Sequence, residues 1–406
     1  MRGRRVVITG MGALSPYGEG ASVMMRGLRD GVCALRSLQE HGIDGLHCGV
    51  AGIVPRLDAK RVPRESRRTM SPMSLHACFA VREALFQAGL DPDAPLPGAG
   101  VAMGSTIGSP EVLQEFFSAY LRDKSVDGMR GTVFFKVMSH TVAANVALAF
   151  GCARRVLAPA AACASGLMAV GLGYEAVASG REDLMICGGA DEFHLLTAAT
   201  FERLGAASLE QEPRLASRPF DTARQGLVCS EGAGALVLES LERAGARGAE
   251  ILAEIKGFAM LSTPANIAHP SAEAIETCMR EALDDALLRP QDIGYVNAHA
   301  TATEWGDIAE GRAVAGLFGD AVPVSSLKGH MGHAMAASGA LELISCIEML
   351  RTSVYIPTYG LETPDARCGA LRHPQASFAV TGKAILKNSF ALGGSNCSLV
   401  LDHCCQ

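Results

Sequence analysis

The chain has 406 residues, of which 49% are hydrophobic and 19% are charged, so it can bury a large core and does not have the composition of a disordered protein. Its formal net charge of −6 argues against a broad nucleic-acid-binding surface, which requires clustered positive charge. The sequence has neither an apolar run of about 18 residues nor a signal-peptide pattern after its basic start, so we predict no membrane span and no secretion.

Short apolar segments alternate with longer helical stretches along the whole chain, which predicts an α/β fold. The polar segment 210–226 lacks a clear period and is predicted to be a surface excursion. Because the order restarts after about residue 245, two similar halves are predicted, residues 1–245 and 246–406. The predicted strands are, in chain order, 6–9, 101–103, 156–162, 184–187, 233–238, 251–258, 295–298, 383–388 and 398–401. The predicted helices are 73–89, 133–150, 164–179, 272–286, 305–317 and 336–350.

The chain has 13 cysteines, and none of them forms a Cys-x-x-Cys pair. Several lie within apolar runs, as Cys187 and Cys346 do, where a thiol behaves as a small hydrophobic group. Neither a disulfide framework nor a zinc site is therefore expected, and a reducing, cytoplasmic setting fits this use of cysteine.

One cysteine lies at a junction of predicted elements. Cys163 stands between the predicted strand 156–162 and the predicted helix 164–179, among alanine and glycine neighbours. The positive end of a helix favours a thiolate, and small neighbours leave room for a substrate. The pattern fits a nucleophile, and the alternative is a buried structural cysteine like most of the others.

A histidine follows a later predicted strand directly. His299 ends the run 295–299, at the edge where open α/β sheets place their ligands. Thr301 and Thr303 follow at a spacing of two and offer hydroxyl groups on one side. Taken alone, His299 could equally be a histidine whose hydrogen bonds are satisfied at a strand end.

Two further segments carry polar groups. Lys328 and His333 lie close together in a glycine-containing segment that is either a site or a polar loop before a helix. His330 and His333 have the spacing of metal ligands, but no third ligand is near, so no metal is predicted. The glycines of segment 388–396 expose backbone N–H groups, which stabilise an oxyanion or merely form a turn.

Together, and in this order, these motifs resemble those of the β-ketoacyl-acyl-carrier-protein synthases, the condensing enzymes of dissociated fatty-acid and polyketide systems. The resemblance covers essentially the whole chain and includes the segments 218–221 and 231–234. It implies the thiolase fold, with two βαβαβαββ-like halves in a five-layered α/β/α/β/α core that is usually dimeric. The elongating branch of this family carries a Cys-His-His set, which Cys163, His299 and His333 match. A histidine at the third motif argues against the initiating branch and the chalcone synthases, which carry asparagine there.

The resemblance also implies a reaction. Cys163 takes an acyl chain from a carrier-protein thioester, and His299 and His333 stabilise the enolate that malonyl-carrier protein leaves when it loses CO2. The backbone N–H groups of Cys163 and Leu392 form the oxyanion hole, and Thr301 and Thr303 bind the phosphopantetheine arm. Lys328 pairs with Glu342 near Glu310, and Asp307 supports the same region. The implied gate and tunnel residues are Ile107, Phe134, Phe201, Phe390 and Leu392.

No metal or tightly bound cofactor is expected, because loss of CO2 drives the condensation. The implied partners are an acyl carrier protein and a second chain, in a homodimer or a heterodimer with a ketosynthase-like subunit. Carrier proteins are acidic, and the candidate basic residues that would bind one are Arg64, Arg67, Arg68 and Arg130.

The sequence departs from the family pattern at three places. Ala300 replaces a glycine, Glu304 stands where proline is common, and the gate segment 391–394 has Leu392 in place of a phenylalanine. These changes leave open whether the pathway is housekeeping fatty-acid synthesis or specialised polyketide or polyene synthesis. Two other functions also remain: a non-catalytic, chain-length-determining partner subunit, and a thiolase acting on coenzyme A thioesters.

Overall fold

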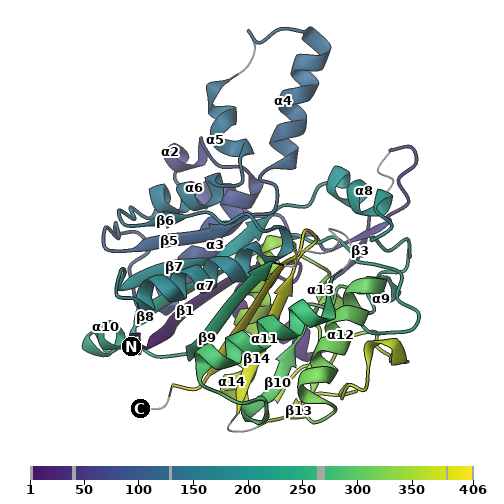
Figure 1. Ribbon diagram of the computed structural model, residues 1–406. Coiled ribbons are helices and arrows are strands. Elements are labelled where there is room, and N and C mark those ends of the chain that lie inside the picture. Colours follow the sequence, from purple (N-terminus) through teal and green to yellow (C-terminus); the bar gives the residue numbers. More distant parts are fainter. Residues whose placement is uncertain (1–2, 39–42, 128–129, 263–269, 381–382, 405–406) are drawn as a thin grey trace.

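The computed structural model describes residues 3–38, 43–127, 130–262, 270–380 and 383–404. Within them, one mixed sheet of 11 strands passes through the molecule in the order β11-β10-β14-β15-β9-β1-β8-β7-β5-β6, with β2 paired to β1 (Figure 1). The strands are β1 (Val6–Ser15), β2 (Gly18–Glu19), β3 (Arg36–Ser37), β4 (Val50–Ala51), β5 (Gly100–Gly104), β6 (Val156–Leu157), β7 (Leu184–Asp191), β8 (Gly232–Ser240), β9 (Ala253–Ser262), β10 (Ile293–Asn297), β11 (Val324–Ser325), β12 (Val354–Tyr355), β13 (Phe378–Ala379), β14 (Ala384–Phe390) and β15 (Ser395–Asp402).

Helices cover both faces of this sheet. The α-helices are α1 (Ala21–Arg29), α2 (Arg64–Arg67), α3 (Pro72–Gln87), α4 (Pro110–Asp123), α5 (Phe134–Val137), α6 (Thr141–Ala149), α7 (Ser165–Ala178), α8 (Leu195–Arg203), α9 (Pro213–Ala216), α10 (Leu241–Ala246), α11 (Ala272–Ala286), α12 (Glu304–Phe318), α13 (Lys328–Met331) and α14 (Ala336–Thr352). The short 3-10 helices are η1 (Ala59–Arg61), η2 (Gly131–Val133), η3 (Ala162–Ala164), η4 (Pro290–Asp292) and η5 (Ala366–Cys368).

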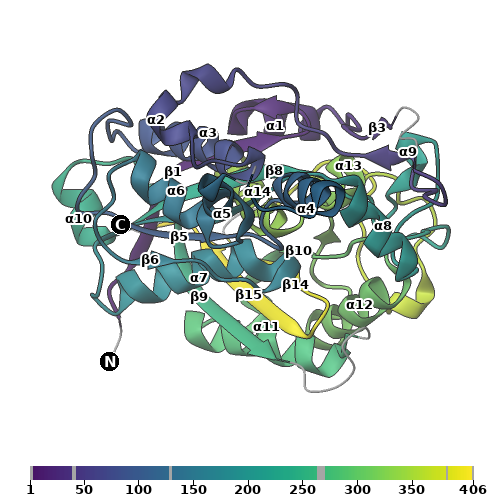
Figure 2. The same ribbon diagram turned by 90° about the horizontal axis from the view of Figure 1, so that it is seen from above.

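The elements stack in five layers. Helices α3 and α6 cover the outer face of the part of the sheet that contains β5, β7 and β8 (Figure 2). Helices α7 and α14 pack on each other in the central layer. They contact strands of this part of the sheet and also strands of its other part, which contains β9, β14 and β15. On the other outer side, α11 packs on β9 and β15, and α12 lies beside it. Three clusters of buried apolar residues fill the spaces between these layers, which confirms the predicted α/β class.

The two central helices begin unusually close together. A Cβ atom at Gly166 in α7 would clash with the backbone oxygen of Ala336, and one at Gly339 in α14 would lie 2.7 Å from the backbone nitrogen of Leu167. Glycine at these two positions therefore lets the start of α7 meet the start of α14. Cys163 and His333 lie just before these two helix starts.

The structure corrects three of the predicted elements. The strand predicted at 156–162 is reduced to Val156–Leu157, at the edge of the sheet, and the helix predicted at 133–150 breaks at Met138 into α5 and α6. The segment 210–226 is not a surface excursion as a whole, because Phe220 and Asp221 are each no more than 1% exposed. Asp221 and Arg224 of this segment pair with groups of the segment 362–365, which a pattern of hydropathy alone does not reveal.

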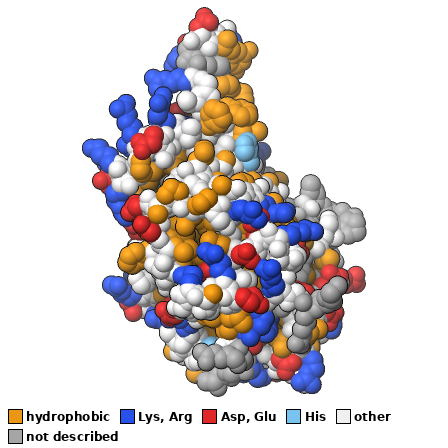
Figure 3. Space-filling model, turned by 90° about the vertical axis from the view of Figure 1, so that its left-hand side faces the viewer, with side chains coloured by type: hydrophobic (Ala, Val, Ile, Leu, Met, Phe, Trp, Pro, Cys, Tyr) orange, Lys and Arg blue, Asp and Glu red, His pale blue; other side chains and the backbone are white. Residues whose placement is uncertain are grey.

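A protrusion formed by α4 and α5 stands clear of the layered body (Figure 1). Apolar side chains gather along it, and Lys and Arg side chains lie towards the opposite edge (Figure 3). Its exposed large apolar residues are Leu113, Phe117, Tyr120, Leu121, Val126, Phe134, Phe135 and Met138. An apolar surface of this kind is typical of a protein–protein interface.

In the described part of the chain, no single helix is long and apolar enough to cross a membrane. Gly131–Val137 and Thr141–Ala149 reach that length and composition only together, and they meet at a bend of 103°.

Candidate active site

The ends of two parallel strands bring the segment of His299 and the glycine-containing segment 388–396 together. Strands β10 and β14 are parallel neighbours, so the residues that follow Asn297 and those that end β14 lie at the same edge of the sheet. The rings of His299 and Phe390 are 6.1 Å apart as a result. Ala391 and Leu392 continue from that strand into the gate segment.

Cys163 occupies the turn that leads into α7. Ala162 has a φ of 46°, a strained value for a residue with a side chain. The hydroxyl of Ser165 holds this turn, because it donates to the oxygen of Ala162 at 2.7 Å and accepts from the nitrogen of Ala161 at 2.8 Å. Cys163 is 6% exposed and faces a cavity at this point.

The two histidines of the predicted set lie against each other. The rings of His299 and His333 are 5.2 Å apart and nearly perpendicular, at 85°. The backbone of His333 is fixed by hydrogen bonds to Val228 and Ser230, and its Nδ1 lies 3.0 Å from the hydroxyl of Ser338. Among the described residues, Nδ1 of His299 and Nε2 of His333 have no hydrogen-bond partner. Each imidazole therefore has one buried ring nitrogen that no described residue satisfies, which is uncommon away from functional sites.

A cavity of about 320 Å³ joins these groups. Its wall contains the predicted nucleophile, both histidines, both threonines and three of the predicted gate and tunnel residues. These are Cys163, His299, His333, Thr301, Thr303, Phe201, Phe390 and Leu392. Ile107 and Phe134 do not line it: they are 54% and 60% exposed on the outer surface. Lys328 and Glu342 lie behind the wall, fully buried.

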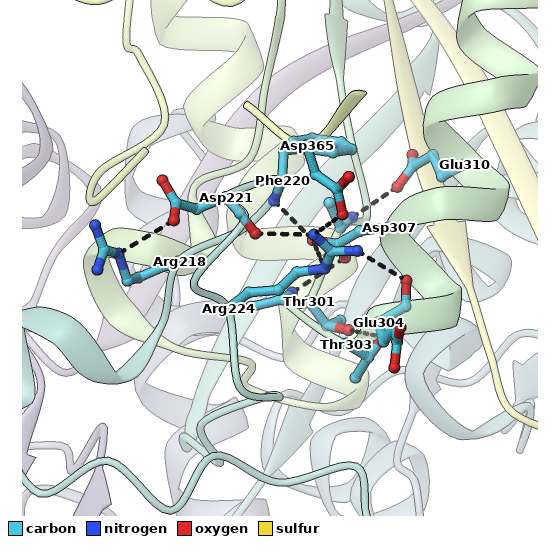
Figure 4. Close-up of polar contacts among 12 residues, drawn as sticks. Arg218, Phe220, Asp221, Arg224, Thr301, Thr303, Glu304, Asp307, Glu310 and Asp365 are labelled. Atoms are coloured by element: carbon cyan, nitrogen blue, oxygen red, sulfur yellow. Dashed lines mark hydrogen bonds and ion pairs between the residues drawn. The ribbon is translucent and has the colours of Figure 1, made fainter. Parts of the chain in front are cut away.

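Two carboxylates one turn apart on α12 hold the loop that carries His299 (Figure 4). Glu310 accepts hydrogen bonds from the backbone nitrogens of His299 and Ala300 at 2.8 and 2.7 Å. Asp307 accepts from the backbone nitrogens of Phe220 and Ala302 at 2.7 and 3.1 Å. Burial raises the pKa of both carboxyl groups, that of Asp307 to about 7.

An arginine that the sequence reasoning missed anchors the same loop from the other side. Arg224, with a side chain only 2% exposed, donates to Asp365 at 2.7 Å, to the backbone oxygen of Asp221 at 2.8 Å and to that of Glu304 at 3.2 Å. Figure 4 shows its guanidinium group between these partners. Arg224 lies inside the segment 210–226, which was predicted to be a surface excursion. One more charged residue in that polar segment did not indicate a buried ion pair.

A second missed residue, Asp191, joins three loops around Cys163. It ends β7 and accepts hydrogen bonds from Thr106, from Ser105 and from the backbone nitrogen of Ala336. Desolvation raises its pKa to about 6, while these donors act in the opposite direction. The signal in the sequence was the acidic pair Asp191 and Glu192 after two glycines at a strand end.

Two lysines share one carboxylate behind the cavity. Lys328 Nζ lies 2.5 Å from Oε1 of Glu342, and Lys387 Nζ lies 2.6 Å from Oε2 of the same residue. The pairing of Lys328 with Glu342 agrees with what the resemblance implied. Lys387 was missed, although a lysine directly after the apolar run 384–386 of a predicted strand is an available sequence signal for a buried charge.

The protonation states follow from this burial. Desolvation raises the pKa of the Cys163 thiol to about 12, and Lys328 acts in the opposite direction. Burial thus opposes the thiolate that the helix end is expected to favour. Burial and the nearby lysines lower the pKa of His299 and His333 well below 6.5. At neutral pH the site holds a thiol beside two neutral imidazoles.

Alkylation of Cys163 by iodoacetamide tests this resting state. Because only the thiolate reacts and the pKa of the thiol is raised, we expect the rate to rise about tenfold per pH unit between about pH 7 and pH 10. Peptide mass spectrometry, which separates Cys163 from the other cysteines, provides the measurement. A plateau below about pH 8 would show instead that the site stabilises the thiolate.

Known proteins resemble this chain over nearly its whole length. The family model "Beta-ketoacyl synthase, N-terminal domain" matches residues 3–244, and "Beta-ketoacyl synthase, C-terminal domain" matches residues 252–362. The 3-oxoacyl-[acyl-carrier-protein] synthase 1 of Escherichia coli strain K12 is 32% identical, over 98% of each chain.

Solved structures share the fold. A β-ketoacyl synthase from Burkholderia phymatum STM815 superposes with a TM-score of 0.95 and 38% identity, over 99% of this chain and 100% of the other. A type II PKS complex, "AntDE:AntF (apo): type II PKS acyl-carrier protein in complex with its ketosynthase bound to the hexaketide", gives 0.88 and 28% identity, over 99% and 100%.

Proposed function

The chain belongs to the β-ketoacyl synthase family, is an acyltransferase of the condensing type with the thiolase fold, and on that premise we propose its specific reaction. It joins an acyl chain carried on Cys163 to malonyl-acyl carrier protein by decarboxylative Claisen condensation and releases β-ketoacyl-carrier protein. The observation that carries this proposal is the single cavity in which Cys163, His299 and His333 meet.

In the first step, Cys163 Sγ attacks the thioester carbon of the acyl-carrier protein. The new C–S bond forms as the bond to the phosphopantetheine sulfur breaks. The thiol proton passes through a neutral imidazole to the leaving sulfur, since the raised pKa of Cys163 keeps the resting group protonated. The backbone N–H groups of Cys163 and Leu392, both on the cavity wall, stabilise the oxyanion.

In the second step, malonyl-carrier protein loses CO2, and the electron pair of the broken C–C bond moves onto the thioester as an enolate. In this proposal the hydroxyl of Ser338 donates to Nδ1 of His333. The proton of the neutral ring therefore lies on Nε2, which has no partner among the described residues. That N–H and one from His299 donate to the enolate oxygen. The carbanion then attacks the acyl carbon, the bond from that carbon to Cys163 Sγ breaks, and the thiolate takes up one proton from water.

The entrance of the cavity takes the carrier's arm. The hydroxyls of Thr301 and Thr303 are 3.0 Å apart on the wall and bind the phosphopantetheine group in this proposal. Leu392 is 44% exposed and occupies the gate position, where it blocks less space than a phenylalanine would. Ile107 and Phe134 remain proposed tunnel residues that a second chain would have to enclose.

A second chain is proposed to cover the apolar protrusion. The exposed side chains of α4 and α5 support pairing with a copy of this chain or with a ketosynthase-like subunit. The proposal treats residues 1–245 as the half that carries the nucleophile. It treats 246–406 as the half that carries both histidines and Lys328.

Intact-protein mass spectrometry with a panel of acyl-carrier proteins tests the acyl-transfer step. The proposal predicts an adduct on Cys163 whose yield depends on the acyl chain and therefore separates fatty-acid from polyketide substrates. No adduct either alone or with co-expressed neighbouring subunits would favour the non-catalytic partner. Loading from coenzyme A thioesters and cleavage of acetoacetyl-CoA, without a carrier protein, would favour the thiolase.

Helix α2 provides the candidate carrier-protein surface. Arg64 and Arg68 are exposed, whereas Arg67 is partly buried and donates to the backbone oxygen of Val62 at 2.8 Å. Because carrier proteins are acidic, reversing both exposed charges (Arg64→Glu with Arg68→Glu) is expected to raise KM for carrier-bound substrates about tenfold, with little change in kcat.

Steady-state assays at low and high salt measure this effect, which high salt should reduce. The matched control reverses the exposed Arg26 and Arg181 and so changes the net charge equally. An unchanged KM in the α2 variant, or an equal rise in the control, would remove this surface from consideration.

A further inference from the structure

Lys387 carries a buried charge that the proposed reaction leaves unused. It lies on β14, one residue before Asn388, and its side chain is fully buried. Its ammonium group contacts Glu342 at 2.6 Å and also donates to the backbone oxygen of Asn388. A fully buried lysine persists only when it is paired and hydrogen-bonded, so these contacts account for its presence but not for its role.

The ion pair of Lys328 and Glu342 is complete without it. One carboxylate and two ammonium groups leave one uncompensated positive charge in a dry interior. The fourth charged group is Glu310, which is held as an acceptor by three donors: the backbone nitrogens of His299 and Ala300, and the side chain of Asn388 at 3.1 Å. Two lysines and two glutamates therefore give a neutral cluster, in which Lys387 supplies the charge that balances Glu310.

This cluster borders the imidazoles. Helix α14 contributes Glu342 and Cys346, α13 contributes Lys328, α12 contributes Glu310, and β10 contributes Tyr295. Both lysines oppose protonation of His299 and His333, together with burial. Loss of Lys387 would leave one net negative charge, which favours imidazolium ions.

Resting on the proposed function, we propose that Lys387 is a positioning residue: it balances the charge of Glu310 and Glu342 and so keeps His299 and His333 as neutral hydrogen-bond donors for the enolate. It touches neither substrate nor the cavity wall. Lys328 anchors the histidine loop and opposes protonation of the rings, and Lys387 adds the second positive charge, which balances Glu310.

The test is a pH titration of ring-13C-labelled histidine by NMR in the full chain, without substrate. Signals are assigned by their loss in His299→Gln and His333→Gln. The half-point is the pH at which half of a ring is protonated. Lys387→Met is expected to raise the half-points of both rings by about one pH unit, as removal of a nearby charge does. The double variant Lys387→Met with Glu342→Gln restores charge balance and is expected to return both half-points to the wild-type range.

The control is Lys256→Met, which removes a lysine that also pairs with a glutamate on a strand but lies partly exposed on β9. Unchanged half-points in Lys387→Met, or an equal shift in Lys256→Met, would overturn the proposal. If Lys387→Met unfolds, a folded double variant with wild-type half-points supports it, and unfolding of both variants overturns it.

In Lys387→Met, the fall in the rate of CO2 release at acidic pH should begin at a higher pH, together with the higher half-points of the two histidines. Histidine half-points that shift without any condensing activity would leave Lys387 in its role and reject the proposed reaction.

Discussion

Replacing Cys163 with alanine is expected to lower the rate of condensation by about 10⁴-fold or more, because no other described residue on the cavity wall can hold the acyl chain as a thioester. Release of CO2 from malonyl-carrier protein is expected to continue, since the two imidazoles that stabilise the enolate remain. The measurement is the rate of β-ketoacyl-carrier formation and, separately, of CO2 release in the same protein.

Cys229→Ala provides the matched control. Cys229 belongs to the same buried apolar cluster as Cys163 but does not line the cavity. Its variant should retain both loading and condensation. Condensation that survives in Cys163→Ala would show that another nucleophile carries the chain.

Replacing His299 or His333 with alanine is expected to produce the converse result. Each substitution removes one donor to the enolate oxygen, and loss of such a donor costs about 2.7–4 kcal/mol in the barrier, or 10²- to 10³-fold in rate. CO2 release should fall by that factor, while acyl loading of Cys163 falls less, because the oxyanion hole of that step uses backbone N–H groups. Burst measurements of loading and single-turnover CO2 release separate the two effects.

His330→Gln distinguishes loss of a donor from disturbance of the loop. His330 is buried three residues before His333, but its Nε2 contacts the backbone oxygen of Pro357 at 3.1 Å and the ring does not line the cavity. Its variant should keep CO2 release near the wild-type rate. An equal loss in His330→Gln, or full CO2 release without His299 and His333, would contradict their assigned roles.

The sequence was sufficient to predict the longer strands of the sheet, most of its long helices and the main residues of the cavity, but it gave no sign of helices α1, α4 and α8. His299 follows a strand end and Cys163 precedes a helix, and both positions depend on local pattern and on sheet topology. Each of these features depends on the residues of one short segment of the sequence. The same reasoning failed for 156–162, where an apolar run lies at an exposed sheet edge.

Residues that act through distant partners could not be predicted. Arg224, Asp191 and Lys387 each owe their role to groups brought near by the fold, and none belongs to a motif that reveals those partners. Ile107 and Phe134 illustrate the reverse: motif position alone placed them in a tunnel, whereas in one chain they face outward. Burial of Cys163, which raises the pKa of its thiol, also depends on the fold and is not visible in the local pattern before the helix.

Single turnover of the acyl-enzyme with 13C-labelled malonyl-carrier protein is the decisive measurement of the proposed condensation. Isolated acyl-Cys163 enzyme is expected to discharge its chain, with one equivalent each of labelled CO2 and β-ketoacyl-carrier protein formed per acyl group lost. An acyl-enzyme that persists, or that loses its chain to water without carbon–carbon bond formation, would show that the enzyme does not catalyse this condensation.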